Sequence, residues 1–108
     1  MGKKINVIIK KPGEPIGHME VIEDKLAVLQ DIVGGSIETV TLATDFMVIC
    51  NEEGRIKGLE YNAEICGIDF VGTVIGVGVD GEDLTDVPMT IEDWKYFCLG
   101  IREDATDC

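Results

Sequence analysis

Residues 69–84 read Asp69-Phe-Val-Gly-Thr-Val-Ile-Gly-Val-Gly-Val-Asp-Gly-Glu-Asp-Leu84 and say most about the fold. The apolar part of this stretch, residues 70–79, predicts a buried strand because it is rich in valine and isoleucine. Gly72, Gly76 and Gly78 share one face of that strand, since side chains alternate along it. A face of glycines lets another backbone, often a helix, approach closely, or it marks a bend. An acidic turn follows the strand.

Two strands and a helix are expected before this stretch. Residues 5–10 are rich in β-branched side chains and predict a buried strand. Proline and glycine within residues 11–15 predict a turn, from which residues 16–22 return as the second strand of a hairpin. Apolar residues at helical spacing then predict a helix over residues 24–33, which Gly34 and Gly35 end in a left-handed cap.

The middle of the chain predicts two further strands and a loop. Residues 36–42 and 46–50 have strand patterns. Asn51-Glu-Glu-Gly54 predicts a tight turn, with Gly54 free to take a positive φ. Residues 56–67 have no clean period, so we expect a long loop there, with room for one short helical turn.

A second helix is expected near the C-terminus. Thr90 and Asp93 have the spacing of a capping box, which predicts a helix that starts at Ile91 and ends at Gly100. The inward residues of this helix are expected to be Ile91, Trp94, Phe97 and Cys98.

Length and composition predict one globular domain over residues 1–108, with a polar tail at residues 103–108. The hydrophobic content of 45% is sufficient for a core. The fold class is α+β, with a mostly antiparallel sheet of about five strands and the helix of residues 24–33 packed on one face. The C-terminal helix either covers more of the sheet or mediates self-association through Trp94 and Phe97.

The chain is strongly acidic. Twenty-one acidic residues oppose nine lysines and arginines, giving a formal net charge of −12. Such a surface repels phosphate backbones and anionic lipids, which argues against direct nucleic-acid or membrane binding. It suits a basic partner, or it simply keeps a small protein soluble. No signal peptide and no apolar run of about 18 residues is present, so a cytoplasmic location is expected.

The sequence contains no convincing motif for catalysis, cofactor binding or metal binding. Gly76-Val-Gly-Val-Asp-Gly81 matches a dinucleotide fingerprint in letters, but Glu82 and Asp83 follow it and would repel a pyrophosphate. The four cysteines lack C-x-x-C spacing and are far in sequence from His18, so no zinc site is expected. Cys50 and Cys98 are interpreted as core residues. His18 is the only histidine, so it would have to supply every histidine function of a catalytic site alone. We therefore predict no catalytic residue and no cofactor.

Carboxylates and amides cluster in two places. The turn of residues 80–86 holds four carboxylates, but it lacks the EF-hand spacing, so it is interpreted as a solvated turn without an assigned metal. Divalent-metal binding stays open as a minor alternative. The candidate partner-binding residues are Asn51, Glu52, Glu53, Asn62, Asp80, Glu82 and Asp83.

Several short segments, in order, carry a family resemblance. They are Pro12-Gly13, Leu29-Gln30, Val33-Gly-Gly35, Ile37-Glu38, Cys50-Asn-Glu-Glu-Gly54, Gly58-Leu59, Asn62, Val71-Gly-Thr73 and Gly81-Glu-Asp83. In these the chain resembles a family of small uncharacterised proteins, known as a domain of unknown function, carried by bacteriophages, plasmids and conjugative elements of Firmicutes. The family pattern places proline after Gly58-Leu59 and a basic residue after Asn62. This chain has Glu60 and Ala63 there, so the resemblance does not extend to anion binding by this segment.

The resemblance implies an accessory protein of a mobile element in the cytoplasm of a bacterial host. We therefore expect a non-enzymatic protein that binds a host or defence protein through its acidic surface, an anti-defence role. The alternative is a binder of a small molecule such as a nucleotide signal, which requires a polar pocket lined by Arg55, Lys57 or Lys95. A homo-oligomer is compatible with either function.

Overall fold

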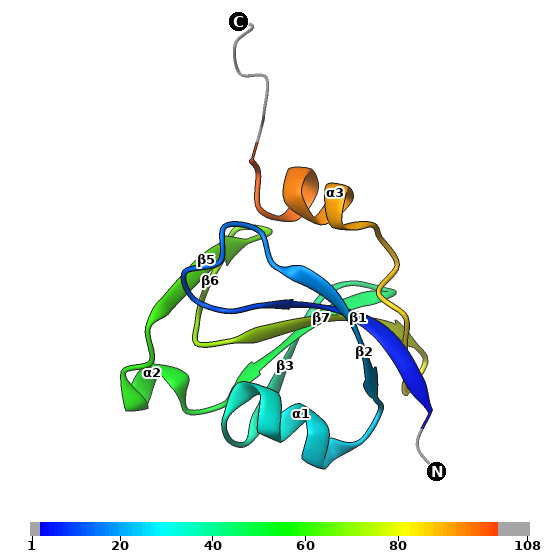
Figure 1. Ribbon diagram of the computed structural model, residues 1–108, viewed down its shortest axis with the longest axis horizontal. Coiled ribbons are helices and arrows are strands. Elements are labelled where there is room, and N and C mark those ends of the chain that lie inside the picture. The colour runs from blue at the N-terminus through cyan, green and yellow to red at the C-terminus, as the bar shows by residue number, and fades with distance from the viewer. Residues whose placement is uncertain (1–2, 102–108) are drawn as a thin grey trace, which may run out of the picture.

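The computed structural model describes residues 3–101, which form a six-stranded antiparallel sheet, a two-stranded sheet and short helices (Figure 1). The strands of the larger sheet are β1 (Lys4–Lys10), β2 (His18–Glu23), β3 (Ile37–Ala43), β4 (Phe46–Asn51), β7 (Val74–Asp80) and β8 (Asp83–Thr85). Their order is β2-β1-β7-β4-β3, and β8 pairs with the end of β7. The predicted α+β class is confirmed. The predicted tail at residues 103–108 lies outside the described part of the chain.

Both faces of the large sheet are covered at its central strands β1, β7 and β4. On one face, Val7 and Ile9 of β1 and Ile75 of β7 pack with helix α1 (Leu26–Val33). On the other face, Ile8 and Val74 pack against the C-terminal helix and the small hairpin. Burial on both sides explains why β1, β4 and β7 are nearly continuous apolar runs, since neither set of alternating side chains meets water. Figure 1 shows α1 and the C-terminal helix on opposite sides of the sheet.

The glycines of β7 make room for neighbouring elements. A Cβ at Gly76 would lie 3.2 Å from Cζ3 of Trp94, which is fully buried. The indole Nε1 of Trp94 donates to the Ile16 carbonyl oxygen at 2.7 Å. A Cβ at Gly78 would overlap the backbone of Asp86. The predicted close approach of a helix to the glycine face is thus confirmed at Gly76, whereas Gly72 lies outside β7.

The C-terminal helix begins with the predicted capping box of Thr90 and Asp93. Its first turn, α3 (Ile91–Asp93), continues into a π-helical segment, η1 (Trp94–Cys98), closed by a 3.0 Å bond from the Leu99 N–H to the Trp94 carbonyl oxygen. The expectation that Phe97 points inward is wrong, because its side chain is 79% exposed. The wider π turn moves Phe97 off the inward face, whereas Trp94 and Cys98 stay on it.

Two predictions in the middle of the chain are wrong. Residues 56–67 are not a long loop, because they contain the end of α2 (Gly54–Lys57) and all of β5 (Tyr61–Ile65). β5 pairs with β6 (Ile68–Val71) in a hairpin whose turn residues, Cys66 and Gly67, both have positive φ. The predicted strand of residues 70–79 is divided between β6 and β7 at Gly72, which has φ 73°.

The turn after β4 also differs from the expectation. Gly54 begins α2 instead of taking a positive φ, and the left-handed residue is Gly58, the C-cap of that helix, with φ 71°. Gly54 is required by space, since a Cβ there would lie 2.9 Å from Cγ2 of Val71. None of the helices within residues 3–101 is both long and apolar enough to cross a membrane.

Candidate functional site

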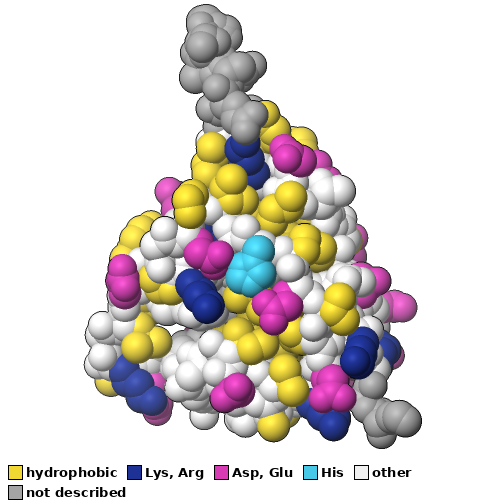
Figure 2. Space-filling model, in the orientation of Figure 1, with side chains coloured by type: hydrophobic (Ala, Val, Ile, Leu, Met, Phe, Trp, Pro, Cys, Tyr) yellow, Lys and Arg dark blue, Asp and Glu magenta, His cyan; other side chains and the backbone are white. Residues whose placement is uncertain are grey.

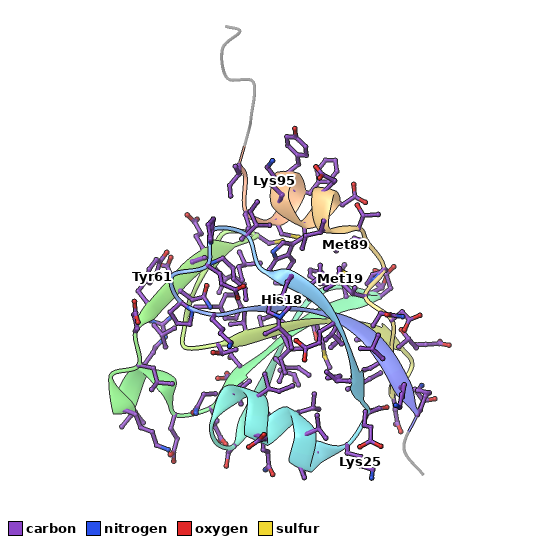
Figure 3. All side chains as sticks on the ribbon, viewed as in Figure 1. His18, Met19, Lys25, Tyr61, Met89 and Lys95 are labelled. Carbon is purple, nitrogen blue, oxygen red and sulfur yellow. The ribbon has the colours of Figure 1, made fainter. Side chains whose placement is uncertain are left out.

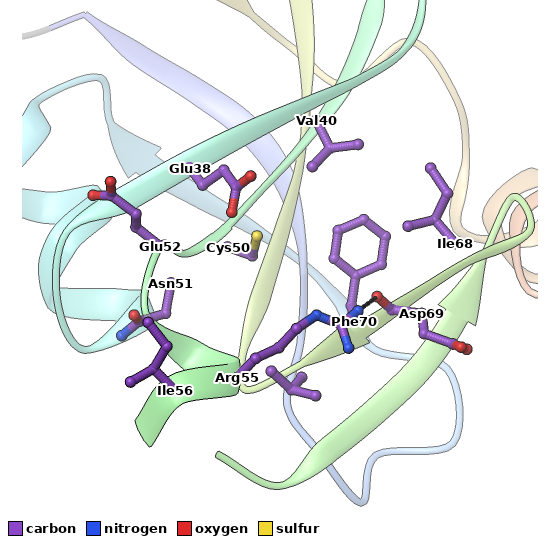
Figure 4. A pocket seen from close by; sticks show the side chains of 11 residues that line it. Glu38, Val40, Cys50, Asn51, Glu52, Arg55, Ile56, Ile68, Asp69 and Phe70 are labelled. Atoms are coloured by element: carbon purple, nitrogen blue, oxygen red, sulfur yellow. Dashed lines mark hydrogen bonds between the residues drawn. The ribbon is translucent and has the colours of Figure 1, made fainter. Parts of the chain in front are cut away.

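A hollow of about 200 Å³ lies where β3, β4, α2 and β6 meet (Figure 4). Its lining residues are Glu38, Val40, Cys50, Asn51, Glu52, Arg55, Ile56, Ile68, Asp69, Phe70 and Val71. Val40 and Phe70 give it an apolar wall, and Glu38 and Arg55 bring opposite charges to it. This hollow therefore offers both apolar contact and charge to a bound group.

Some charged groups of the hollow are fixed by hydrogen bonds and others are not. Nη2 of Arg55 donates to the backbone carbonyl oxygen of Asp69 at 2.8 Å. The Asp69 carboxylate accepts the Tyr61 hydroxyl at 3.0 Å and points away from the hollow in Figure 4. Within residues 3–101 the carboxylates of Glu38 and Glu52 form no hydrogen bond or ion pair, and both residues are exposed. Glu38 and Glu52 are thus the carboxylates that the hollow presents.

Cys50 lies in the hollow between these charges. Burial raises the pKa of its thiol, the Glu38 carboxylate raises it further, and Arg55 acts in the opposite direction. A protonated, buried thiol is a poor nucleophile. Cys50 is therefore a packing residue, as the sequence predicted.

Asn51 lines the hollow, and its side chain forms hydrogen bonds with the surrounding backbone. Its Nδ2 donates to the carbonyl oxygen of Val33 at the end of α1, at 3.2 Å, and its Oδ1 accepts the N–H of Glu53 at 2.8 Å. Asn51 is 5% exposed, so both bonds are shielded from water. This asparagine joins the end of α1 to the start of α2 and so positions Arg55.

Asn62 is also internal and lies apart from the hollow. Its Oδ1 accepts Nζ of Lys10 at 2.8 Å, and its Nδ2 donates to the carbonyl oxygens of Lys10 and Gly72 at 2.8 and 2.7 Å. All of its bonds therefore go to groups of the same chain. The position gives Asn62 a structural role.

The acidic turn lies at the other end of the central strands from Glu52 and Glu53. β4 runs antiparallel to β7 with Phe46 opposite Gly78, so the turn between Asp80 and Asp83 extends beyond the Phe46 end of β4. Asn51 closes the opposite end of β4, about 17 Å away along the strand. The structure thus brings Asn51, Glu52 and Glu53 together and leaves Asp80, Glu82 and Asp83 separate.

The acids do not form one continuous stripe on the face shown in Figure 2, where they alternate with lysines and apolar side chains. On this face His18 lies between two carboxylates, with Nδ1 3.0 Å from Glu14 and Nε2 2.9 Å from Glu20. These hydrogen bonds, led by the one from Glu20, raise the pKa of His18. Within residues 3–101 no three histidine, cysteine, aspartate or glutamate side chains converge in a way that could hold a metal ion.

Sequence reasoning missed most of the hollow. Glu38, Asp69 and Phe70 come from β3 and β6, and the position of β6 was not predicted. Arg55 was named as a base that should line a pocket if the protein binds a small molecule, and it does line this one. The signal that could have located one wall of the site is the i, i+2 spacing of Glu38 and Val40, which puts both side chains on one face of β3.

Comparison with known proteins gives one match. Residues 5–98 match the model of a family described as "Domain of unknown function (DUF3846)". Neither the curated proteins nor the solved structures contain a match.

Proposed function

The chain belongs to the DUF3846 family, and we propose that it is a non-enzymatic accessory protein of a phage or other mobile element that binds a basic host or defence protein. The distribution of charge between surface and interior carries the proposal. Lys10 and Lys95 are only 3% and 6% exposed, whereas no acidic residue between positions 3 and 101 is buried. Among exposed side chains the excess of acids over bases is therefore larger than the sequence composition alone indicates. Such a surface accelerates and orients encounter with a basic partner in the host cytoplasm.

The hollow is where a basic side chain of that partner would be received. The alkyl stem of a lysine or arginine would pack against Val40 and Phe70, and its cation would lie near the carboxylates of Glu38 and Glu52. Arg55 keeps its positive charge when it donates to the Asp69 carbonyl oxygen, but one cation offsets only one of the two carboxylates, Glu38 and Glu52. In protein–protein interfaces a few residues contribute most of the binding energy, and they are commonly side chains anchored in a pocket. The hollow, with acidic residues around it, is a pocket of that kind for a basic side chain.

Affinity capture tests the proposal. The protein is immobilised, a bacterial host lysate is applied at low salt, and retained proteins are eluted with salt and then purified. We expect at least one basic protein to be retained, since opposite charges attract most strongly at low ionic strength. Purified, it should bind the wild type about tenfold more tightly than Glu38→Gln/Glu52→Gln.

A matched variant distinguishes binding at the hollow from attraction by the overall negative charge. Glu82→Gln/Asp83→Asn removes the same number of charges from the turn at the far end of the sheet. Binding by this variant should fall less than threefold. Failure to retain a basic protein, or equal losses in the two variants, would reject the hollow as the binding site.

A second candidate function is favoured by Arg55 alone. An arginine at the rim of a pocket is a common partner for the phosphate or carboxylate of a small ligand. If the hollow binds a nucleotide signal, thermal-shift screening should find a nucleotide that stabilises the wild type and leaves Arg55→Gln unaffected. Stabilisation by a nucleotide together with no binding of basic proteins would replace the first proposal by this one.

A further inference from the structure

Three sulfur atoms gather near the C-terminal helix, remote from the hollow. Sγ of Cys98 lies 3.8 Å from Sδ of Met89, toward which its thiol is directed. The thiol of Cys66 is hydrogen-bonded to the same Cys98. The backbones of the two cysteines are also hydrogen-bonded, because the Cys66 N–H donates to the Cys98 carbonyl oxygen at 2.8 Å. Residues 32 positions apart in the sequence therefore hold their sulfurs side by side.

The backbone at Cys66 is unusual for a cysteine. It occupies the first position of the β5–β6 turn with φ 51°, and no other residue except glycine has a positive φ within residues 3–101. Asparagine, aspartate or glycine is the usual choice at this position of a two-residue hairpin turn. Local preference therefore does not explain the cysteine, but its position beside Cys98 does.

Two of the three sulfur-bearing residues, Cys66 and Cys98, line a hollow that is open to solvent. This hollow of about 400 Å³ is lined by Glu64, Cys66, Gly67, Phe97, Cys98, Leu99 and Gly100. Cys66 is exposed at its rim and Cys98 lies deeper. Met89, labelled in Figure 3 on the segment that leads into α3, is half-buried behind them. The hollow therefore gives an ion direct access to Cys66 and borders Cys98, whose Sγ lies 3.8 Å from Sδ of Met89.

The two thiols and the thioether are soft metal ligands. Thiolate and thioether sulfur prefer Cu(I), whereas zinc sites take four nitrogen and sulfur ligands. Three sulfurs at metal–sulfur distances of about 2.3 Å in one plane lie about 4 Å apart, close to the 3.8 Å between Cys98 and Met89. We propose that Cys66, Cys98 and Met89 bind one Cu(I) ion in a trigonal three-sulfur site. On binding, each thiol releases its proton to solvent and the copper keeps its oxidation state. At Cys98, where burial raises the thiol pKa to about 12, the copper–sulfur bond has to offset this proton loss.

An anaerobic competition assay tests this site. The full chain, kept reduced, is titrated into Cu(I) held by a coloured chelator, and the loss of colour reports transfer. We expect one copper per chain and an X-ray absorption spectrum with three sulfur neighbours. Cys66→Ser, in an exposed turn and therefore expected to fold, should lower the affinity about a hundredfold or more. Met89→Leu, which keeps the side-chain volume, should reduce the sulfur neighbours to two.

Matched controls complete the assay. Cys50→Ala and Met47→Leu remove sulfurs outside the set and should leave the copper affinity unchanged. The site is rejected if the wild type takes no copper from the chelator, if Cys66→Ser retains the wild-type affinity, or if a control variant loses it. Equal affinity for Zn(II) would also reject it, since that result indicates a general thiol pair instead of a Cu(I) site.

Discussion

Lys10 carries its ammonium group into the interior, where Asn62 accepts its hydrogen bond at 2.8 Å. Burial lowers the pKa of this lysine, and the charge of Glu14 opposes that shift. Asn62 also satisfies two buried carbonyl oxygens, so one amide supports both the lysine and the backbone beside it. Removing the amide therefore has a larger effect than the loss of one hydrogen bond.

Asn62→Leu should lower the free energy of unfolding by about 3 kcal/mol, because it leaves a buried cation and two buried carbonyl groups without partners. In a Lys10→Met background the same substitution should cost only about 1–2 kcal/mol, since no buried charge is then stranded. Urea unfolding of the four proteins measures both values. Equal costs in the two backgrounds would show that Asn62 does not support the lysine.

His18 gives a pH-dependent prediction at the same scale. Its pKa is raised, first by the hydrogen bond to Glu20 and then by the one to Glu14. A raised folded-state pKa adds stability below the unfolded value of 6.5, and this contribution is lost as the pH rises through the folded value. Because the side chain is 41% exposed, the contribution should be at most about 1 kcal/mol.

The measurement is a proton NMR titration of the single histidine, in wild type and in Glu14→Gln/Glu20→Gln. The wild-type pKa should lie above 6.5, and the variant should return toward that value. The stability difference between wild type and His18→Gln should be larger at acidic than at alkaline pH. A titration midpoint at or below 6.5 in the wild type contradicts the assigned bonds.

The two asparagines show what residue identity alone leaves open. The partner-binding role predicted for Asn51 and Asn62 stays a prediction, and in the structure their side chains bond to groups of the same chain. A polar side chain in a sequence looks the same whether its partner is a ligand or a backbone carbonyl. Only the fold shows which backbone groups need a partner.

At the scale of elements, Gly76 and Gly78 set how closely other segments approach β7. An alanine at Gly76 meets one side-chain carbon of Trp94, which can shift slightly. An alanine at Gly78 meets the backbone of Asp86, which cannot move without displacing β8. Gly76→Ala should therefore cost about 1 kcal/mol and Gly78→Ala about 3 kcal/mol.

Urea unfolding measures these costs, and the fluorescence of the only tryptophan reports on the helix. Gly76→Ala should change the emission of Trp94, because the added methyl group lies against its ring. Gly78→Ala places its methyl group against the backbone of Asp86 and not against the Trp94 ring, so it should change that emission less. A larger cost for Gly76→Ala than for Gly78→Ala would contradict this packing.

Elements with a strong apolar period were predicted well, and those that depend on turn chemistry were not. β1, α1, β4 and the capping box at Thr90 follow from residue patterns. The β5–β6 hairpin was missed because Cys66-Gly67 is not a usual hairpin turn pair. Phe97 was misplaced because the 3.6-residue period does not hold in a π-helical turn.

For the whole molecule, fold class was predictable and the hollow was not. The α+β class follows from the number and types of predicted segments. The hollow needs the order of the strands, because Glu38, Arg55 and Phe70 come from three separate elements that meet only in space. Two pairs of acids that are adjacent in the sequence, Glu52-Glu53 and Glu82-Asp83, drew attention instead, although the two pairs lie at opposite ends of β4.

The central claim is that the hollow, and not the overall negative charge, receives a cationic side chain. The most direct measurement is the dissociation constant of one fluorescent arginine-rich peptide for three proteins: wild type, Glu38→Gln/Glu52→Gln and Glu82→Gln/Asp83→Asn. The account predicts that the first variant binds about tenfold more weakly and that the second stays within threefold of wild type. Equal weakening of both variants would show that the peptide senses only net charge, and that result would contradict the account.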